Sequence, residues 1–309
     1  MRLVRWSFVV GVSLVGSLIS TAHADGDALV DNLGPREVAV GEALRASATG
    51  ASAIGMNPAG LPLNRELVFE GGYGYRPADE ASLFGASACD STGPAPGCFF
   101  YSYASNDVHR THTGGMAIAY PISPRVMLGS TLKYFNFKSD LATEPKASGF
   151  ASDLGLTVRL TDLVNIGVAG QNVLGKESTE FDRAVGGGIL ARPLPNLAVS
   201  FDMRWKFVDA NEMMTMANPS SHPVRYGGGA ELFLRSGTGQ TGFPLRAGAL
   251  RDSGLDTTFV SLGGGIATMK FAVDVAARYA VSGPKDTTFI ASMRFYGPRM
   301  AAPSANGAE

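Results

Sequence analysis

Histidine, serine and cysteine are the residue types whose spacing could support chemistry in this 309-residue chain. His109 and His112 stand three positions apart, and Asp107 is the nearest residue that could complete a set of metal ligands. The sequence places all three in a polar stretch between two predicted strands, where solvated histidines are the usual case. We therefore expect neither a metal nor any other cofactor.

The sequence supports hydrolytic chemistry little more than it supports a metal site. The Gly-x-Ser-x-Gly turn that exposes a nucleophilic serine is absent from the sequence. A lipid hydrolase of another kind would need a Ser or Asn/His constellation, and His222 is the one member that the sequence offers. We expect that the chain is not an enzyme.

The first 24 residues have the layout of a secretory signal peptide. A basic start is followed by an apolar run from Trp6 to Ile19 and by small residues up to Ala24, which predicts cleavage before Asp25. The alternative, an uncleaved anchor, is less favoured because the run is shorter than the roughly 20 residues that a spanning helix needs. Cleavage removes Arg2 and Arg5, so the charge becomes 24 − 27 = −3, which gives no reason to expect nucleic acid.

The two cysteines of the chain, Cys89 and Cys98, enclose a Gly- and Pro-rich stretch. In an exported protein this arrangement predicts a disulfide that closes a hairpin loop. A pair of unpaired thiols is the less favoured alternative, and the spacing is far from the Cys-x-x-Cys of redox proteins.

Beyond residue 65 the chain alternates apolar and polar residues in segments separated by turn signals. Residues 197–208 show this most clearly, since Phe201 and Trp205 share one face while Asp202 and Arg204 share the other. The predicted strands are 66–76, 82–90, 97–105, 113–121, 125–137, 149–160, 164–172, 183–192, 197–208, 222–235, 243–251, 257–267, 271–281 and 286–297.

A soluble β-sandwich would alternate in the same way, with its charged face in water. Three features favour an all-β transmembrane antiparallel barrel of about fourteen strands: long segments, aromatic residues near strand ends, and connections that tend to alternate between tight and long. The aromatic residues are Tyr75, Tyr120, Tyr134, Phe207, Tyr279 and Phe295. The connections 236–242, 252–256 and 282–285 break the alternation.

The stretch ahead of the strands is small and apolar, and it ends in Asn57, Pro58, Ala59, Gly60 and Leu61. Pro58 and Gly60 break any helix there, and the period-two pattern begins shortly afterwards. This order resembles the start of the FadL-type outer-membrane transporters and of the related PorV-like proteins. The resemblance implies an N-terminal hatch (25–65) inside a fourteen-stranded barrel (66–297) that moves hydrophobic compounds. The composition of residues 298–309 predicts a disordered tail.

Glycine triplets at 186–188, 227–229 and 263–265 fall inside three predicted strands of the same direction. A phosphate-binding loop would lead into a helix, so that interpretation does not apply. Either the hatch packs against these glycines, or they allow the barrel wall to curve.

Two sets of residues are candidates for a substrate site. Arg204 and Lys206 lie on the non-lipid face and could attract a fatty-acid carboxylate. Phe99, Phe100, Tyr101 and Tyr103 could line an apolar pocket or pack on the hatch. In FadL-like proteins the third strand is kinked and opens into the membrane, but no proline or glycine interrupts residues 98–105, which puts lateral opening in doubt.

We expect a channel in the outer membrane of a Gram-negative bacterium for passive diffusion of hydrophobic compounds such as long-chain fatty acids. The alternative is a PorV-like barrel that serves as a structural or docking partner in protein export. The expected partners are membrane lipids, a hydrophobic small molecule, the outer-membrane assembly machinery and, for the alternative, a secretion-system partner. A continuous apolar cavity favours the channel, and a filled lumen favours docking.

Overall fold

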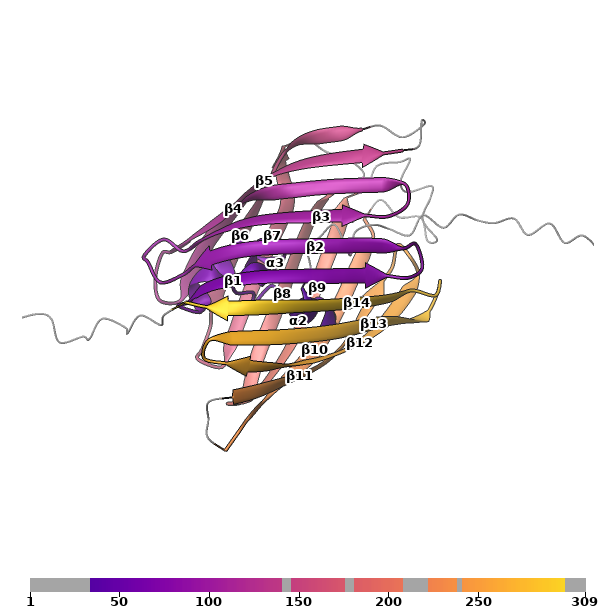
Figure 1. The fold of residues 1–309 in the computed structure, drawn as a ribbon. Helices are drawn as coiled ribbons and strands as arrows, with labels where there is room; N and C mark the ends of the chain where they lie inside the picture. Colours follow the sequence, from indigo (N-terminus) through magenta and orange to yellow (C-terminus); the bar gives the residue numbers. More distant parts are fainter. Residues whose placement is uncertain (1–33, 141–145, 176–180, 208–221, 238–240, 298–309) are drawn as a thin grey trace, which may run out of the picture.

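The chain forms a closed barrel of fourteen antiparallel strands, each paired with its neighbours in sequence, and β1 closes on β14 (Figure 1). The computed structural model describes residues 34–140, 146–175, 181–207, 222–237 and 241–297. The strands are β1 (Leu67–Arg76), β2 (Ala81–Asp90), β3 (Gly97–Ser105), β4 (His109–Pro121), β5 (Val126–Ser139), β6 (Ala147–Arg159), β7 (Val164–Gly175), β8 (Arg183–Leu194), β9 (Leu197–Phe207), β10 (Val224–Arg235), β11 (Thr241–Asp252), β12 (Thr257–Thr268), β13 (Phe271–Ser282) and β14 (Thr287–Tyr296).

The predicted fold class is confirmed, and each predicted strand has its counterpart in the wall. The largest difference is at β4, which begins at His109 and not at residue 113, because the polar stretch 109–112 pairs fully with β5. The predicted signal peptide (1–24), the start of the predicted hatch (25–33) and the predicted tail (298–309) lie outside the described residues. None of the described helices has the length and apolar character to cross a membrane.

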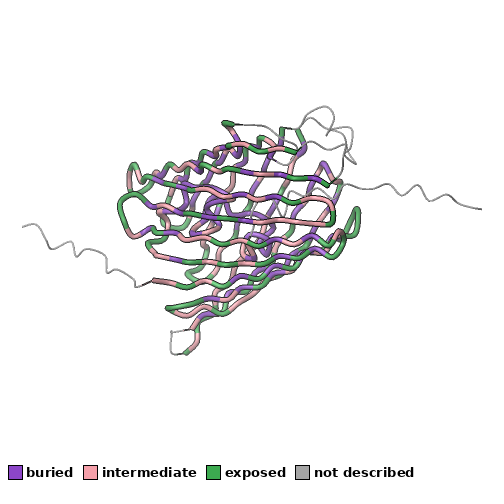
Figure 2. The backbone as a smooth tube through the Cα atoms, turned by 45° about the horizontal axis from the view of Figure 1, so that its top comes forward, coloured by how far each residue is buried: buried purple, intermediate pink, exposed green. Residues whose placement is uncertain are grey.

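Buried and exposed residues alternate along the strands (Figure 2), because successive side chains of a strand point to opposite sides of the wall. The exposed outer face carries most of the large apolar side chains, and most of the buried charged side chains lie on the inner face or in the segment inside the barrel. In β9, Phe201 and Trp205 are 49% and 38% exposed, whereas Asp202 and Arg204 are 2% and 5% exposed. The faces predicted for this strand are therefore confirmed, and the charged residues belong to the interior.

Residues 34–66, which we call the inner segment, fill the middle of the barrel. They contain α2 (Pro35–Ala39), α3 (Ala51–Met56) and the 3-10 helix η1 (Pro58–Leu63). α2 packs against β11–β14, α3 against β2 and β3, and η1 against β4–β6, so the segment touches most of the wall. Most of its alanines and apolar side chains are almost fully buried, which suits a chain wedged into a narrow space.

The two ends of the barrel differ. β1 starts and β14 stops at one end, where most connections are tight, such as 122–125, 195–196 and 269–270. We call this the turn end. At the opposite end, the loop end, the longer connections 140–146, 176–182 and 208–223 occur, although 253–256 and 283–286 are short.

Candidate functional site

The inner segment is held to the wall through Asn57, whose side chain is fully buried. Its Nδ2 atom lies 2.8 Å from the carbonyl oxygen of Arg45, 3.1 Å from that of Leu156 and 3.1 Å from Oγ1 of Thr157. Its Oδ1 atom accepts the backbone N–H of Ala59 at 3.1 Å, which caps η1. One side chain thus joins two parts of the inner segment to strand β6.

Two wall glycines make room for this corner. A Cβ atom on Gly155 would overlap Oδ1 of Asn57, and one on Gly129 would overlap the backbone of Pro58 and Ala59. Because real Cβ atoms are not found at such separations, β5 and β6 need glycine where the Asn-Pro-Ala turn meets them. The Asn-Pro-Ala motif and the two wall glycines that make room for it therefore form one structural unit.

The glycine triplets of β8, β10 and β12 also make room for the inner segment. A Cβ on Gly229 would stand 2.7 Å from Cα of Val40, one on Gly263 would stand 2.6 Å from Cβ of Ala39, and one on Gly227 would overlap the carbonyl oxygen of Gly41. These contacts confirm the hypothesis that the inner segment packs against the triplets.

Only the alternate glycines of each triplet face inward. The central ones are open: a Cβ on Gly228 would have its nearest neighbour at 3.5 Å and one on Gly264 at 3.4 Å, in both cases a wall atom. Because side-chain positions alternate along a strand, the first and third glycines of each triplet face the lumen and the central one faces outward.

A buried ion pair fixes the middle of the inner segment. Nη1 of Arg45 lies 3.2 Å from Oδ2 of Asp202, and the same oxygen accepts the backbone N–H of Arg45 at 2.9 Å. The two side chains are 5% and 3% exposed. Gly167 and Gly186 leave the space for Arg45, since a Cβ on Gly186 would come within 2.6 Å of its Nε.

Glu42 joins the inner segment to the loop-end half of the wall. Its Oε1 atom lies 3.1 Å from Nη1 of Arg278, and its Oε2 atom lies 3.9 Å from Nη1 of Arg225. These arginines also pair with wall carboxylates, Arg225 with Asp252 at 2.5 Å and Arg278 with Asp286 at 3.8 Å. Glu42 therefore completes a network in which every charge has a partner.

Arg36 enters a second network, nearer the turn end. Its Nε atom lies 3.1 Å from Oε2 of Glu231, which also receives Nε of Arg246 at 2.5 Å. Arg246 extends to Asp274 at 2.5 Å, and Asp274 also binds Arg294. The inner segment is thus held at three levels by ion pairs with the wall.

Strand β7 departs from regular pairing where it meets the inner segment. Its register with β6 shifts between Ser152 and Leu154, and Asn172 has a φ of 53°. Oδ1 of Asp153 accepts the N–H of Asn172 at 2.7 Å, and Nε2 of Gln171 donates to the carbonyl of Gly55 at 2.6 Å. Gln171 faces inward by the regular alternation of β7 and reaches the end of α3, and the irregularity follows it at Asn172.

Arg204 and Lys206 are both buried on the inner face of β9. Nζ of Lys206 lies 2.9 Å from Oδ2 of Asp182, so a carboxylate already neutralises that ammonium group. A fatty-acid carboxylate would have to displace Asp182 or share Lys206 with it. The assignment of these two residues to substrate binding stays a prediction.

The aromatic residues of β3 do not form one pocket. Phe99 and Tyr101 are 69% and 43% exposed on the outer face, whereas Phe100 is 7% exposed and packs in the core that includes Ile54 of α3. Tyr101 and Tyr103 line a groove on the outside of the barrel. The predicted shared pocket is wrong because neighbouring residues of a strand cannot face the same side.

β3 pairs with β2 and β4 along its whole length without a shift in register. This unbroken pairing agrees with the absence of proline or glycine from residues 98–105. In the described wall the pairing of β3 is therefore unbroken at the place where the resemblance implies a lateral opening.

His109 and His112 lie on strand β4 and not in a loop, which corrects their predicted setting. Their odd separation places them on opposite faces: the ring of His109 packs on Phe137, while that of His112 meets Tyr103 on the outer face. They cannot share a metal ion. Among the described residues there is no group of three or more His, Cys, Asp or Glu side chains placed to hold one.

Cys89 and Cys98 form a disulfide between directly paired positions of β2 and β3. Both are buried, and Sγ of Cys98 lies 3.9 Å from the carbonyl oxygen of Gly50. The disulfide therefore borders the inner segment at the turn end of the barrel.

His222 lies just before β10 and packs edge-on against Phe207.

Sequence reasoning missed Arg36, Glu42 and Arg45, the three charged residues with which the inner segment grips the wall. One signal could have found them. Charges in an otherwise small, apolar stretch that is expected to be buried require partners of opposite sign, and the predicted lumen supplied those partners.

No protein-family model matches the sequence, and no curated protein does. Several solved structures share its fold. The CymD monoaromatic hydrocarbon channel is 13% identical with a TM-score of 0.62, covering 88% of this chain and 99% of its own. The toluene transporter TbuX of Ralstonia pickettii is 13% identical with a TM-score of 0.63, covering 86% and 98%. A Pseudomonas aeruginosa FadL homologue is 8% identical with a TM-score of 0.60, covering 85% and 98%.

The barrel therefore has the fold of the FadL-type hydrophobic transporters, as the N-terminal resemblance predicts. At this identity the likeness shows the fold. What the protein transports or binds has to be argued from its own residues.

Proposed function

We propose that this protein spans the outer membrane of a Gram-negative bacterium and provides a passive route for hydrophobic small molecules. Two observations support the location and the class of cargo. The outer face of the wall is a continuous apolar band, as a bilayer requires of a closed barrel. The solved barrels that share its fold include a monoaromatic hydrocarbon channel and toluene transporters.

The observation that carries the proposal is the way in which the inner segment closes the lumen. It is covalently continuous with β1, and its grip on the wall combines apolar and glycine contacts with hydrogen bonds and ion pairs such as Asn57–Thr157 and Arg45–Asp202. The polar contacts have polar replacements once water or a ligand enters. The segment is therefore suited to shift and reopen the passage, as a hatch does.

Long-chain fatty acids are the cargo that we propose within this class. A fatty acid would bring a carboxylate past Arg204 and Lys206, which face the lumen from β9. The ion pair of Lys206 with Asp182 would then exchange one carboxylate for another, without leaving the ammonium group bare.

A second function, docking without transport, is favoured by one observation. At the level of the inner segment the interior is filled: Val38, Val40, Leu44 and Leu61 are at most 2% exposed. A permanently filled barrel would act as a PorV-like structural partner in protein export, with its loop or turn end as the contact surface.

Uptake measurements in a deletion strain separate the two functions. We expect cells that lack the protein to take up labelled oleate or toluene more slowly, and the intact gene to restore the rate. Uptake equal to that of the parent strain for both compounds would remove the channel and leave docking. Liposomes that contain the purified barrel provide the matched assay without other proteins.

A further inference from the structure

Charged residues are distributed very unevenly on the outer face of the wall. Among the described strand residues that alternate onto this face, the charged ones at the loop end are all cations, and each lies within two residues of its strand's end: Arg110, Lys138, Arg183 and Arg251. At the turn end the outward charge is an anion, Asp90. The outward-facing charges that the described strands carry at the loop end are therefore all positive.

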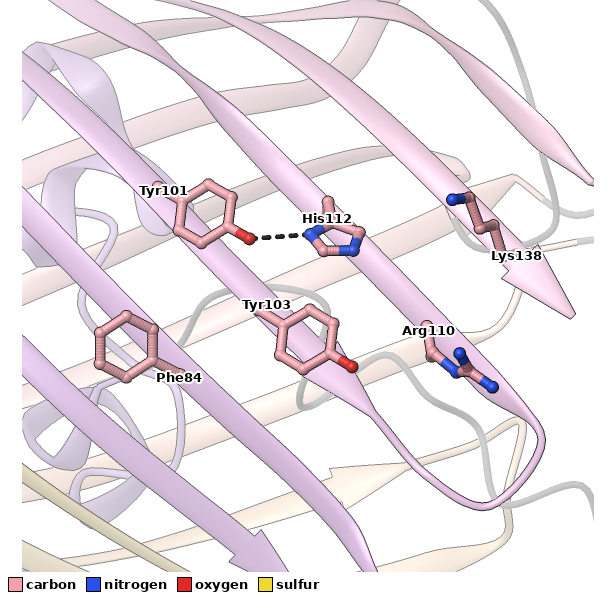
Figure 3. Close-up of a pocket in the computed structure, with 6 residues that line it drawn as sticks. All are labelled: Phe84, Tyr101, Tyr103, Arg110, His112 and Lys138. Atoms are coloured by element: carbon pink, nitrogen blue, oxygen red, sulfur yellow. Dashed lines mark hydrogen bonds between the residues drawn. The ribbon is translucent and has the colours of Figure 1, made fainter.

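Two of these cations belong to a groove of about 450 Å³ on the outside of β2–β5. Figure 3 shows its lining residues, which are Phe84, Tyr101, Tyr103, Arg110, His112 and Lys138. They come from four adjacent strands, and the register places Phe84 opposite Tyr103, Tyr103 opposite His112, and Arg110 opposite Lys138.

The rings of the groove hold one another in place. The hydroxyl of Tyr101 and Nδ1 of His112 are 2.7 Å apart, and the rings of Tyr103 and His112 have centroids 4.8 Å apart (Figure 3). Aromatic side chains with a polar edge favour the boundary between acyl chains and headgroups. The groove therefore has a rigid aromatic floor at the level of a membrane interface.

Its charges are not balanced. Arg110 and Lys138 face each other directly across β4 and β5, an arrangement that destabilises a sheet unless an anion lies near. Asp140 pairs with Arg110 at 2.5 Å, although both side chains are more than half exposed. Within the described residues no carboxylate lies at ion-pairing distance from Lys138, so the groove keeps one uncompensated cation.

We propose that this groove binds the phosphorylated sugar headgroup of an outer-leaflet glycolipid of the lipid A type. Arg110 and Lys138 bind a phosphate, and Tyr103 and His112 lie against the sugar. The acyl chains follow the apolar outer surface nearer the turn end, where Phe99, Met116 and Leu132 pair across β3–β5. A phosphate suits this site because it can contact two cations at once.

The inference rests on the outer-membrane location proposed above, with the loop end facing outward as the longer loops of such barrels do, but it can be tested without any transport. The full-length protein is folded in detergent and titrated with diphosphoryl lipid A, and bound lipid is counted by native mass spectrometry. Arg110→Gln combined with Lys138→Gln should weaken binding by about fivefold for each charge removed. Arg183→Gln combined with Arg251→Gln, which removes the same charge outside the groove, should leave binding unchanged. Asp140→Asn should strengthen it.

Three results would overturn the proposal. They are equal losses in both double variants, equal binding of phosphatidylglycerol and lipid A, and competition by inorganic phosphate alone at concentrations similar to those of the lipid. The heat-modifiable gel mobility of folded barrels verifies that each variant has folded. Unchanged uptake of oleate and toluene in the groove variants would leave the proposed channel intact, so the two proposals can fail separately.

Discussion

A side chain on Gly229 would have its first carbon 2.7 Å from the Cα atom of Val40, so wall strand and inner segment meet backbone to backbone. Glycine is the residue that permits this approach. The wall and the inner segment thus pack most tightly against each other's backbone where the wall has no side chain, and a methyl group is enough to disturb this contact.

Replacing Gly229 with alanine should therefore loosen the inner segment and destabilise the barrel by about 1–3 kcal/mol, the usual effect of overpacking. The change can be followed through Ser47→Cys, a nearly isosteric probe at a position that is 2% exposed. We expect maleimide to label this cysteine faster in the Gly229→Ala background.

Gly228→Ala is the matched control for this prediction. Gly228 faces outward, where a Cβ would meet its nearest atom at 3.5 Å, so labelling and stability should stay at the parent values. Equal behaviour of the two variants would contradict the idea that the triplets seat the inner segment.

The glycine triplets also show which parts of the fold could be predicted from the sequence and which could not. Composition and period predicted fourteen strands and placed these glycines inside them, because both signals are local in the chain. Which glycine of a triplet faces the lumen depends on the parity of the strand, and the three glycines themselves do not reveal that parity. Residue identity alone therefore could not separate Gly228 from Gly229.

Replacing Asn57 with alanine should remove the anchor of the Asn-Pro-Ala corner. Several buried backbone and side-chain groups would lose a partner at once, and each unsatisfied group costs about 1–3 kcal/mol. We expect a lower urea midpoint for unfolding in phospholipid vesicles and faster leakage of a hydrophilic dye from liposomes. The control is Asn64→Ala, an exposed residue just beyond η1, which should change neither value.

The pair of Arg45 and Asp202 should behave as a unit. Asp202→Asn removes the carboxylate that pairs with a buried guanidinium, and breaking a buried pair typically costs about 3–5 kcal/mol. Arg45→Met combined with Asp202→Asn should recover part of that loss, because the double variant removes both charges of the pair. A double-mutant cycle on unfolding midpoints measures the coupling. Strict additivity of the single variants would show that the pair does not hold the segment.

The pair of Arg45 and Asp202 also shows what could not be predicted from the sequence. The inward charges of the strands could be predicted from alternation, but their partners could not, since Arg45 and Asp202 are separated by 157 positions. Partner choice depends on the path of the inner segment through the lumen, and the bulge of β7 at Asn172 adds an irregularity that has no period. Local patterns thus located the charges but not the contacts between them.

Stability should depend on pH through Asp79, in the turn between β1 and β2. Burial alone would raise the pKa of Asp79, but its hydrogen bonds with Arg76, at 2.8 and 2.6 Å, and the charge of Arg76 outweigh that effect and lower the pKa. A carboxyl whose folded pKa is depressed stabilises the fold above its unfolded pKa, near 3.9, and loses that contribution as the pH falls through the folded value.

Asp79→Asn should therefore cost about 1–2 kcal/mol at pH 7, less than a fully buried pair would because the carboxylate is partly exposed. The difference from the parent should shrink as the pH is lowered below about 4. Urea midpoints at pH 7 and pH 3 provide the comparison. Asp256→Asn removes a carboxylate from an exposed pair with Arg251 and should have little effect at either pH. A deficit of Asp79→Asn that is the same at both pH values would contradict this assignment.

Removing the disulfide by Cys89→Ala with Cys98→Ala should lower the free energy of unfolding by about 2–3 kcal/mol, because the unfolded chain gains the freedom of a short loop. A second effect follows from its position. Sγ of Cys98 lies 3.9 Å from the carbonyl of Gly50, so the alanine pair removes a contact of the inner segment as well as the covalent link.

The same background, now without native cysteines, accepts Ser47→Cys as its single thiol. Faster maleimide labelling than in the disulfide-containing parent would show that the hairpin β2–β3 helps to hold the inner segment. A lower unfolding midpoint with unchanged labelling would limit the disulfide to its own hairpin. If neither value changed, the cross-link would contribute to neither the barrel nor its closure, and the grip on the inner segment would then depend on the ion pairs and glycine seats alone.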